Sequence, residues 1–446
     1  MSHLLVPGPA ESTAATVWAA AVDERDDPGS LEVVAADGTR AGLATWDHRL
    51  EGGRRRVNIR RVRLTGLAPR TRQRVELRRG GSTLAKATIG TLPDRLPGLE
   101  DRPFTVLLGS CFAQRRDGAG NVGRTYALLP TGARPDVKIL CGDQVYLDAP
   151  SFWTVFPAVT SGELRRRLLE TYLEAWGQDP GFRTFLADGP NAFTSDDHDF
   201  WNNAPNASIT APATLIAPLR RTWLTEARTL YRAFQRPETP RLTVMDMDGL
   251  SICVADVRVD RTEGEEGFMS PADLDAVRTW ASGLTSPGCL AIGQLLFAAP
   301  ASRIGRHMDM GLPDYRQYSA LVEALAGAPH SIVILTGDVH FGRVAVCELG
   351  DGRDLVEVVA SPMSLVGPIP PNHWRAAPAR FPAVALPAGV QRNVRTETAY
   401  QYNGNHFATV EFSRAGARVR LKVQAWPTEN RGRPPVPVRT YVHWIS

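Results

Sequence analysis

Three short apolar runs in this chain each end at a glycine that is followed by polar side chains. They span residues 104–108, 137–141 and 332–335. Runs this short, closed by glycine, predict buried β-strands. In open α/β sheets, ligand sites gather at the carboxyl ends of the strands. The sequence therefore predicts one shared site from the residues just past these ends, which are Cys111, Asp143, Asp338 and His340.

The rest of the second half mixes helical patterns with hairpins. Helices are predicted over residues 163–176 and 271–282, the latter with Ser270 as N-cap, Pro271 in its first turn and Gly283 at its end. Paired strand patterns around glycine-containing turns predict three hairpins, over residues 242–256, 344–359 and 407–423. Parallel-type strands combined with hairpins indicate a mixed α/β fold, a two-sheet sandwich flanked by helices.

Residues 1–93 show a different pattern of short, alternating strands separated by turns, which predicts a small N-terminal β-sandwich. Residues 94–102 are rich in proline and glycine and are interpreted as a linker. The second domain is then residues 103–446. Residues 368–387, rich in proline and alanine, are interpreted as a long loop or lid.

Composition narrows the class of protein. The chain has 446 residues, 43% apolar, 22% charged and a net charge of +4, which gives no support to a role on nucleic acid or a membrane surface. No stretch is long and apolar enough to span a bilayer, and the first residues lack a secretion signal, so the expected location is the cytoplasm unless a signal was removed. Five widely spaced cysteines indicate reduced thiols.

A run of carboxylates lies between the second and third of these strands. Asp196, Asp197 and Asp199 surround His198, and the bulky Phe200 and Trp201 follow at once. One interpretation is a solvated loop. The aromatic residues instead favour burial, where crowded carboxylates need a cation to neutralise them. On that interpretation the run belongs to a metal site.

These blocks resemble, in sequence and order, those of the PhoD-like alkaline phosphatases of the calcineurin-like metallophosphoesterase superfamily. The four blocks are residues 109–111 (Gly-Ser-Cys), 142–146 (Gly-Asp-Gln-Val-Tyr), 196–203 (Asp-Asp-His-Asp-Phe-Trp-Asn-Asn) and 337–340 (Gly-Asp-Val-His). Residues 255–258 resemble the family's Asp-Thr-Arg block, and residues 1–93 its fibronectin-like domain. Ser195 and Asp199 depart from the family, which usually has Trp and Glu there.

The resemblance implies a ligand set for two metal ions. One ion, expected to be Fe³⁺, is held by Cys111, Asp143, Tyr146 and His340. Asp143 bridges to a second ion, expected to be Ca²⁺, which Asn202 and Asp338 complete. Thiolate and phenolate donors suit a trivalent ion, and carboxylate and amide oxygens suit a hard divalent one. Other divalent metals remain open.

The implied reaction is hydrolysis of a phosphate ester by a metal-activated hydroxide, as in an alkaline phosphatase or phosphodiesterase. The substrate is a small-molecule, lipid or polymer phosphate ester, and monoester or diester is left open. His198 either protonates the leaving group or orients a metal ligand. Arg258 either clamps the phosphate or pairs with Asp256 or Asp260. His406 is a weaker candidate for the same site.

Two readings from other classes stand beside this one. A non-catalytic metal-binding or adhesion protein on the same fold predicts an incomplete ligand set, whereas every expected ligand type is present. A dinucleotide-binding enzyme needs a glycine-rich turn between a strand and a helix. Residues 118–123 spell Gly-x-Gly-x-x-Gly, but no strand pattern precedes them, and we interpret them as a loop.

Overall fold

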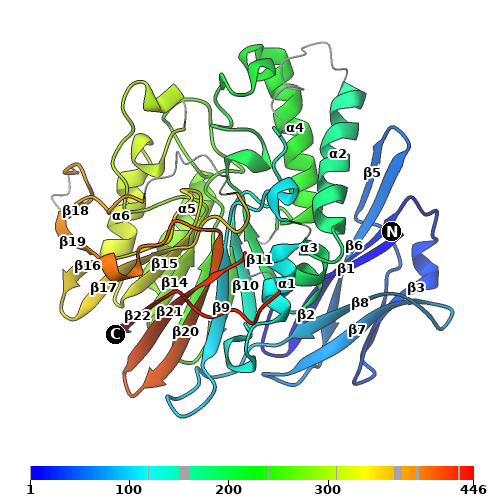
Figure 1. Cartoon of the computed structure of the whole chain (residues 1–446), viewed down its shortest axis with the longest axis horizontal. Coiled ribbons are helices and arrows are strands. Elements are labelled where there is room, and N and C mark those ends of the chain that lie inside the picture. The colour runs from blue at the N-terminus through cyan, green and yellow to red at the C-terminus, as the bar shows by residue number, and fades with distance from the viewer. Residues whose placement is uncertain are drawn as a thin grey trace.

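Four β-sheets with helices around them make up the structure, a computed structural model (Figure 1). It describes residues 2–118, 120–149, 161–239, 241–307, 309–365, 374–386, 391–429 and 432–446. Two of the sheets are built by the first ninety residues and two by the rest of the chain. None of the described helices combines the length and apolarity needed to cross a lipid bilayer.

The N-terminal part is a β-sandwich of two antiparallel sheets, as predicted. One sheet has the strand order β1 (His3–Ala10), β2 (Ala14–Val22), β6 (Arg55–Thr65), β5 (His48–Gly52). The other has the order β4 (Arg40–Gly42), β3 (Leu31–Ala35), β7 (Arg72–Arg79), β8 (Ser82–Gly90). Buried side chains such as Val17, Val33 and Val75 form the core between them. The domain limits at residues 93 and 103 stay predictions.

The third sheet carries two of the three predicted apolar strands side by side. Its order is β11 (Asn191–Thr194), β10 (Val137–Cys141), β9 (Phe104–Gly109), β20 (His406–Ala415), β21 (Arg418–Pro427), β22 (Arg439–Ile445). Strands β9, β10 and β11 are parallel, and the remaining pairs are antiparallel. The carboxyl ends of β9, β10 and β11 therefore meet at one edge of the sheet.

The fourth sheet contains the remaining predicted strand. Its order is β12 (Thr243–Met247), β13 (Leu250–Val254), β14 (Gly288–Ala291), β15 (Ile332–Thr336), β17 (Arg353–Val359), β16 (Arg343–Gly350), β19 (Arg392–Thr396), β18 (Arg380–Phe381). Strands β13, β14, β15 and β17 are parallel, while β12 and β16 join as hairpin partners. All three predicted hairpins are present, as β12–β13, β16–β17 and β20–β21.

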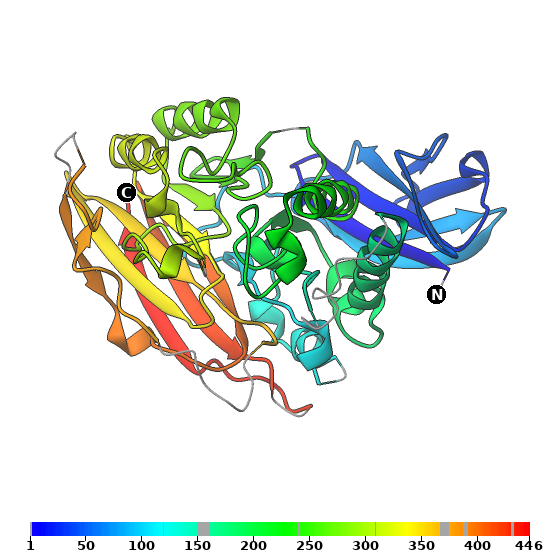
Figure 2. The same cartoon turned by 90° about the horizontal axis from the view of Figure 1, so that it is seen from above.

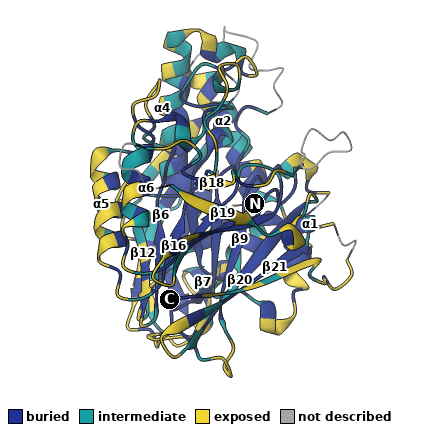
Figure 3. Ribbon diagram, turned by 90° about the vertical axis from the view of Figure 1, so that its left-hand side faces the viewer, coloured by how far each residue is buried: buried dark blue, intermediate teal, exposed yellow. Residues whose placement is uncertain are grey.

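The third and fourth sheets face each other across a shared apolar core. Val106 and Ile139 of one sheet belong to the same buried cluster as Val333 and Val356 of the other. The helices are α1 (Asn121–Ala127), α2 (Ser161–Gly177), α3 (Phe182–Ala187), α4 (Ala217–Phe234), α5 (Pro271–Ser282) and α6 (Tyr318–Ala326). Helices α5 and α6 cover the outer side of the fourth sheet, with their exposed faces outward (Figure 3). This is the two-sheet sandwich flanked by helices that the sequence predicted.

The N-terminal sandwich packs against the helices of the second part. Trp18 of β2 lies 5.2 Å from Trp176 of α2 and 5.4 Å from Phe234 of α4, measured between ring centroids. The Trp18 indole N–H donates to the Ala233 carbonyl over 2.9 Å. Seen from above, α2 and α4 lie between the N-terminal strands and the two larger sheets (Figure 2). One buried cluster therefore spans both parts of the chain.

Two local predictions concern the glycine-containing loop at residues 118–123 and the lid at residues 368–387. Residues 118–123 have no strand before them, as expected, but Asn121 to Gly123 open helix α1, so the predicted loop was wrong in its second half. The helix forms there because Gly120, at a φ of 99°, turns the chain into it. Of the predicted lid, residues 368–373 and 387 lie outside the described residues, and residues 374–386 include the short strand β18.

Candidate metal centre

The carboxyl ends of the central strands deliver the predicted polar residues. Cys111 follows β9, Asp143 follows β10, and Asp338 and His340 follow β15. The Cys111 main-chain N–H donates to the Gly142 carbonyl over 3.2 Å, which ties the first two strand ends together. The Cys111 thiol sulfur lies 3.6 Å from the main-chain carbonyl oxygen of Asp338, so the end of β15 lies beside the ends of β9 and β10. Residues far apart in sequence thus meet at one place.

The backbone is strained at the same residues. Cys111, Asp143, Asp338 and His340 have φ values of 53°, 57°, 70° and 58°. Positive φ is uncommon for residues other than glycine and costs on the order of 1–3 kcal/mol each, so it persists where the surroundings enforce it, often at functional sites. Four of the six predicted metal ligands share this feature, and it is independent of their chemistry.

Glycines allow the strand ends to approach this closely. A Cβ on Gly337 would lie 2.2 Å from the Ser110 hydroxyl oxygen and 3.0 Å from the Cys141 carbonyl oxygen. A Cβ on Gly142, where φ is 86°, would lie 2.4 Å from the Asp196 Cβ. Both positions follow a predicted strand, and glycine there lets the ligand-bearing turns pack together.

Cys111, Asp143 and Tyr146 form one contacting group. The Cys111 sulfur lies 3.5 Å from Asp143 Oδ2, to which the Tyr146 hydroxyl donates over 3.2 Å. The Ser361 hydroxyl donates to the Cys111 sulfur over 3.2 Å. Burial, followed by the charges of Asp143 and Asp338, raises the pKa of the Cys111 thiol well above its usual range. Burial and the neighbouring Cys111 also raise the pKa of Tyr146. A cation would offset these costs and favour the ionised donors.

Carboxylates form a second group, which overlaps the first at Asp143. One potential ligand atom from each of Asp196, Asp197 and Asp338 lies within 4.8 Å of the others, and the same holds for Asp143, Asp197 and His198. Asp197 belongs to both sets. Asp196 Oδ2 is buried and has no hydrogen-bond partner among the described residues. Burial, and then the neighbouring carboxylates, raise the pKa of Asp338 well above its usual range. Buried, crowded oxygens with an orphaned acceptor fit a cation.

Asn202 contacts this second group. Its amide nitrogen donates to Asp197 Oδ2 over 3.4 Å. Its carbonyl oxygen accepts from the hydroxyls of Ser208 and Thr210 over 3.2 and 3.1 Å. These two bonds orient the amide toward Asp197. Asn202 therefore contacts the carboxylate group that also contains Asp338. The family resemblance assigned Asn202 and Asp338 to the same metal ion.

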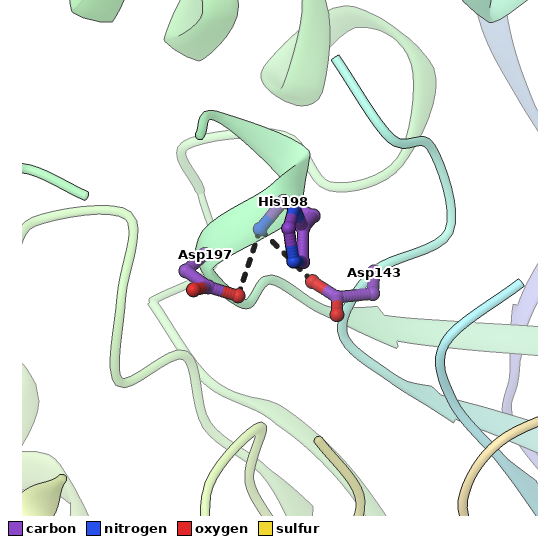
Figure 4. Close-up of side chains that lie close together, drawn as sticks. All are labelled: Asp143, Asp197 and His198. Atoms are coloured by element: carbon purple, nitrogen blue, oxygen red, sulfur yellow. Dashed lines mark hydrogen bonds between the residues drawn. The ribbon is translucent and has the colours of Figure 1, made fainter. Parts of the chain in front are cut away.

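His198 lies in a short helical turn, Asp197–Asp199, against both groups (Figure 4). Its main-chain N–H donates to Asp143 Oδ1 over 3.0 Å and to Asp197 Oδ1 over 2.9 Å. The ring Nδ1 lies 2.8 Å from a carboxylate oxygen of Asp148, and the ring stacks on Tyr146 at 4.4 Å. Burial lowers the pKa of His198, but the carboxylates of Asp148, Asp197 and Asp143 outweigh it and raise the pKa well above the usual value.

Arg258 is held away from the open space. Its guanidinium is buried, with Nε 2.7 Å from Asp196 Oδ1 and Nη2 3.3 Å from Asp309 Oδ1. Nη1 donates to the Ala204 carbonyl over 2.7 Å. The ion-pair partners are thus Asp196 and Asp309, rather than the expected Asp256 or Asp260, although Asp256 accepts from the Arg258 main-chain N–H. This geometry favours a role in holding Asp196, and the phosphate clamp stays a prediction without support from it.

A pocket of about 800 Å³ opens beside the carboxylate group, whereas Cys111, Asp143 and Tyr146 are not among its lining residues. Asp197, His198, Asn202, Asp338 and His340 lie in its wall. The rest of the lining includes apolar side chains and two arginines, among them Phe297, Pro300, Phe341, Pro378, Arg343 and Arg375. The predicted candidates on different strands therefore face a single space large enough for an organic substrate.

His406 does not line this pocket. Its ring is buried, with Nδ1 2.8 Å from the Gly404 carbonyl oxygen and a T-shaped contact with the Tyr402 ring at 5.0 Å between centroids. Sequence reasoning also missed two residues that matter. Asp148 holds His198, and Asp309 lines the pocket and contacts Arg258. Asp148 stands five residues past Asp143, a nearness that could have signalled it, whereas Asp309 lies in a long loop with no motif.

Comparison with solved structures supports the fold. The structure of PhoD aligns with a TM-score of 0.64 at 13% sequence identity, over 98% of this chain and 89% of that one. The purple acid phosphatase PPD1 from yellow lupin (Lupinus luteus) seeds aligns with a TM-score of 0.58 at 11% identity, over 99% of this chain and 74% of that one. No protein-family model and no curated protein sequence matches the chain. The resemblance drawn from the motifs is thus confirmed as a shared fold.

Proposed function

We propose that this protein is a metal-dependent hydrolase of phosphate esters. The observation that carries the proposal is that two sets of potential ligands share Asp197 and reach one large pocket through Asp197, His198 and Asp338. The sets are Asp143, Asp197 and His198, and Asp196, Asp197 and Asp338. Overlapping groups suit the short metal–metal spacing of two-metal hydrolases. Both solved structures reported above are phosphatases of the same fold, and their likeness agrees with the proposal.

The residues divide into two candidate sites. Cys111, Asp143, Tyr146 and His340 would hold one ion, for which Fe³⁺ is the expected occupant. Asp143, Asn202 and Asp338 would hold the other, expected to be Ca²⁺, with Asp196 or Asp197 as further oxygen donors that the structure adds. Bound ions of this kind polarise phosphoryl oxygens and lower the pKa of a coordinated water.

Two side chains of the protein would act on the substrate directly. Asp148 holds Nδ1 of His198, which leaves Nε2 as the ring nitrogen able to donate a proton to the leaving alkoxide. Arg375 lies in the pocket wall, where its guanidinium would attract the anionic ester. The apolar wall formed by Phe297 and Phe341 would contact an organic leaving group.

Elemental analysis of the purified protein, paired with hydrolysis assays on 4-nitrophenyl phosphate and bis(4-nitrophenyl) phosphate, tests this function. We expect stoichiometric metal and turnover of at least one ester. Asp143→Asn should lower kcat/KM at least about 100-fold, because it removes the carboxylate shared by both sites. The ratio of the two activities would define the preferred ester.

A matched control comes from a carboxylate outside the pocket. Asp354 pairs with His443 at 2.8 Å and does not line the pocket. Asp354→Asn should leave metal content and turnover near those of the unaltered protein. Wild-type turnover in Asp143→Asn, or hydrolysis by protein shown to lack metal, would overturn the proposal.

A further inference from the structure

A second cavity lies at the junction of the N-terminal sandwich and the helices. It has a volume of about 240 Å³ and shares no lining residue with the pocket over the candidate metal centre. Four aromatic side chains from four different elements form its floor and walls: Trp18, Trp176, Phe193 and Phe234. It is smaller than the roughly 300–1,000 Å³ typical of sites for drug-sized molecules. The cavity therefore suits a compact apolar group.

Two arginines in the cavity wall have no carboxylate at ion-pair distance among the described residues. The described ion pairs join neither Arg61 nor Arg236 to a carboxylate. Arg61 donates to the carbonyls of Arg232 and Ala233 at the end of α4, both over 2.9 Å. Burial lowers the pKa of Arg61 to about 10, with a smaller opposing effect from Asp47. The cost of burying this charge is thus only partly offset.

The Arg236 side chain is also buried, and its hydrogen bonds are incomplete. It is 8% exposed, and its Nη2 donates to the Arg241 carbonyl. Its Nη1 is buried without a hydrogen-bond partner among the described residues. The one acid in the wall, Glu11, is paired with Arg63 outside the cavity, with Nε and Oε1 3.1 Å apart. Two arginines without a described ion-pair partner thus line the cavity beside an aromatic surface, and Arg236 also lines a neighbouring pocket with Asp256 and Asp260.

We propose that this cavity binds a small amphipathic anion, a carboxylate with an apolar body of about seven carbons. The aromatic side chains would cover the apolar body. The guanidiniums of Arg61 and Arg236 would pair with the carboxylate, whose planar geometry they match. This site is separate from the proposed phosphoesterase pocket, and its ligand would bind whether or not that function holds.

Isothermal titration calorimetry on the full chain, with octanoate, 1-octanol and acetate as probes, tests the proposal. We expect octanoate to bind at least about tenfold more tightly than 1-octanol, which lacks the charge, and than acetate, which lacks the apolar body. Equal affinity for octanoate and 1-octanol, or no binding of octanoate, would overturn it.

Variants locate the binding. Arg61→Met and Arg236→Met should each weaken octanoate about tenfold and leave 1-octanol unchanged. Arg56→Met, on the same strand as Arg61 but outside the cavity, should bind octanoate like the unaltered chain, because Arg56 pairs with Glu51 and neither residue lines the cavity. Val244 lies in the cavity wall and is 41% exposed, so Val244→Trp should fold normally and block entry. Undiminished octanoate binding in Val244→Trp would contradict the site even if an arginine variant failed to fold.

Discussion

His406 is a buried imidazole whose charged form is strongly disfavoured in the folded chain. Burial lowers its pKa to about 4, against an ordinary value near 6.5, and the Gly404 carbonyl only partly opposes this effect. Its Nε2 has no hydrogen-bond partner among the described residues. Below pH 6.5 the unfolded chain gains a proton at this residue that the folded chain does not, so stability falls as pH drops toward 4.

We predict that the stability of the His406→Gln variant falls less between pH 6.5 and pH 4 than that of the unaltered chain. The lost stability attributable to His406 amounts to about 3 kcal/mol at pH 4 and is absent above pH 6.5. Urea unfolding at several pH values between 4 and 7 would measure it. The quantity compared between the two chains is the slope of the unfolding free energy against pH. His330→Gln, a histidine outside the buried clusters, is the control. Identical slopes for His406→Gln and the unaltered chain would refute this account.

At the residue level, four candidate ligands could be inferred from the sequence because they follow the ends of apolar strands, whereas Tyr146 and Asn202 came only from the family resemblance. Cys111, Asp143 and Asp338 could be named from that pattern, and their strained backbone could not, because φ depends on the packing of the strand ends. Asp309 comes from a loop without periodicity, and only the fold brings it to the pocket. The partners of Arg258 were likewise set by tertiary packing, since Asp196 and Asp309 lie 62 and 51 residues away in sequence.

At the scale of elements, the candidate centre depends on how closely β15 approaches β9. We predict that Gly337→Ala destabilises the protein by about 1–3 kcal/mol, because the added Cβ would meet Ser110 at 2.2 Å. Gly132→Ala, where a Cβ would meet nothing within 4 Å, should change stability by no more than about 0.5 kcal/mol. Chemical denaturation of both variants measures the contrast, and equal stabilities would argue against close strand packing.

Elements with explicit end signals could be predicted, and elements without them could not. Helix α5 begins and ends as expected, because the Ser270 hydroxyl accepts from the Asp273 N–H and Gly283 closes the last turn. Helix α4 starts after Ile216, which offers no side-chain cap, and no helix is predicted there from the sequence. Its position is fixed by packing instead, since Trp223, Leu230 and Phe234 enter the cluster shared with the N-terminal sandwich.

At the scale of the whole molecule, the N-terminal sandwich is part of the core rather than an appended module. Removing residues 1–93 would expose the faces of Trp176 and Phe234 that Trp18 covers. We therefore predict that residues 94–446 alone unfold at a lower temperature and bind the dye ANS. A shortened chain with the unfolding temperature of the full chain and no dye binding would show that the two parts are independent.

Anomalous X-ray diffraction from crystals of the purified protein, with its metal content identified beforehand, would locate the two proposed metal ions most directly. We expect one anomalous peak in contact with the Cys111 sulfur and the Asp143 carboxylate, and a second ion beside Asp143, Asn202 and Asp338. Metal bound elsewhere on the molecule, or a protein without stoichiometric metal, would contradict it.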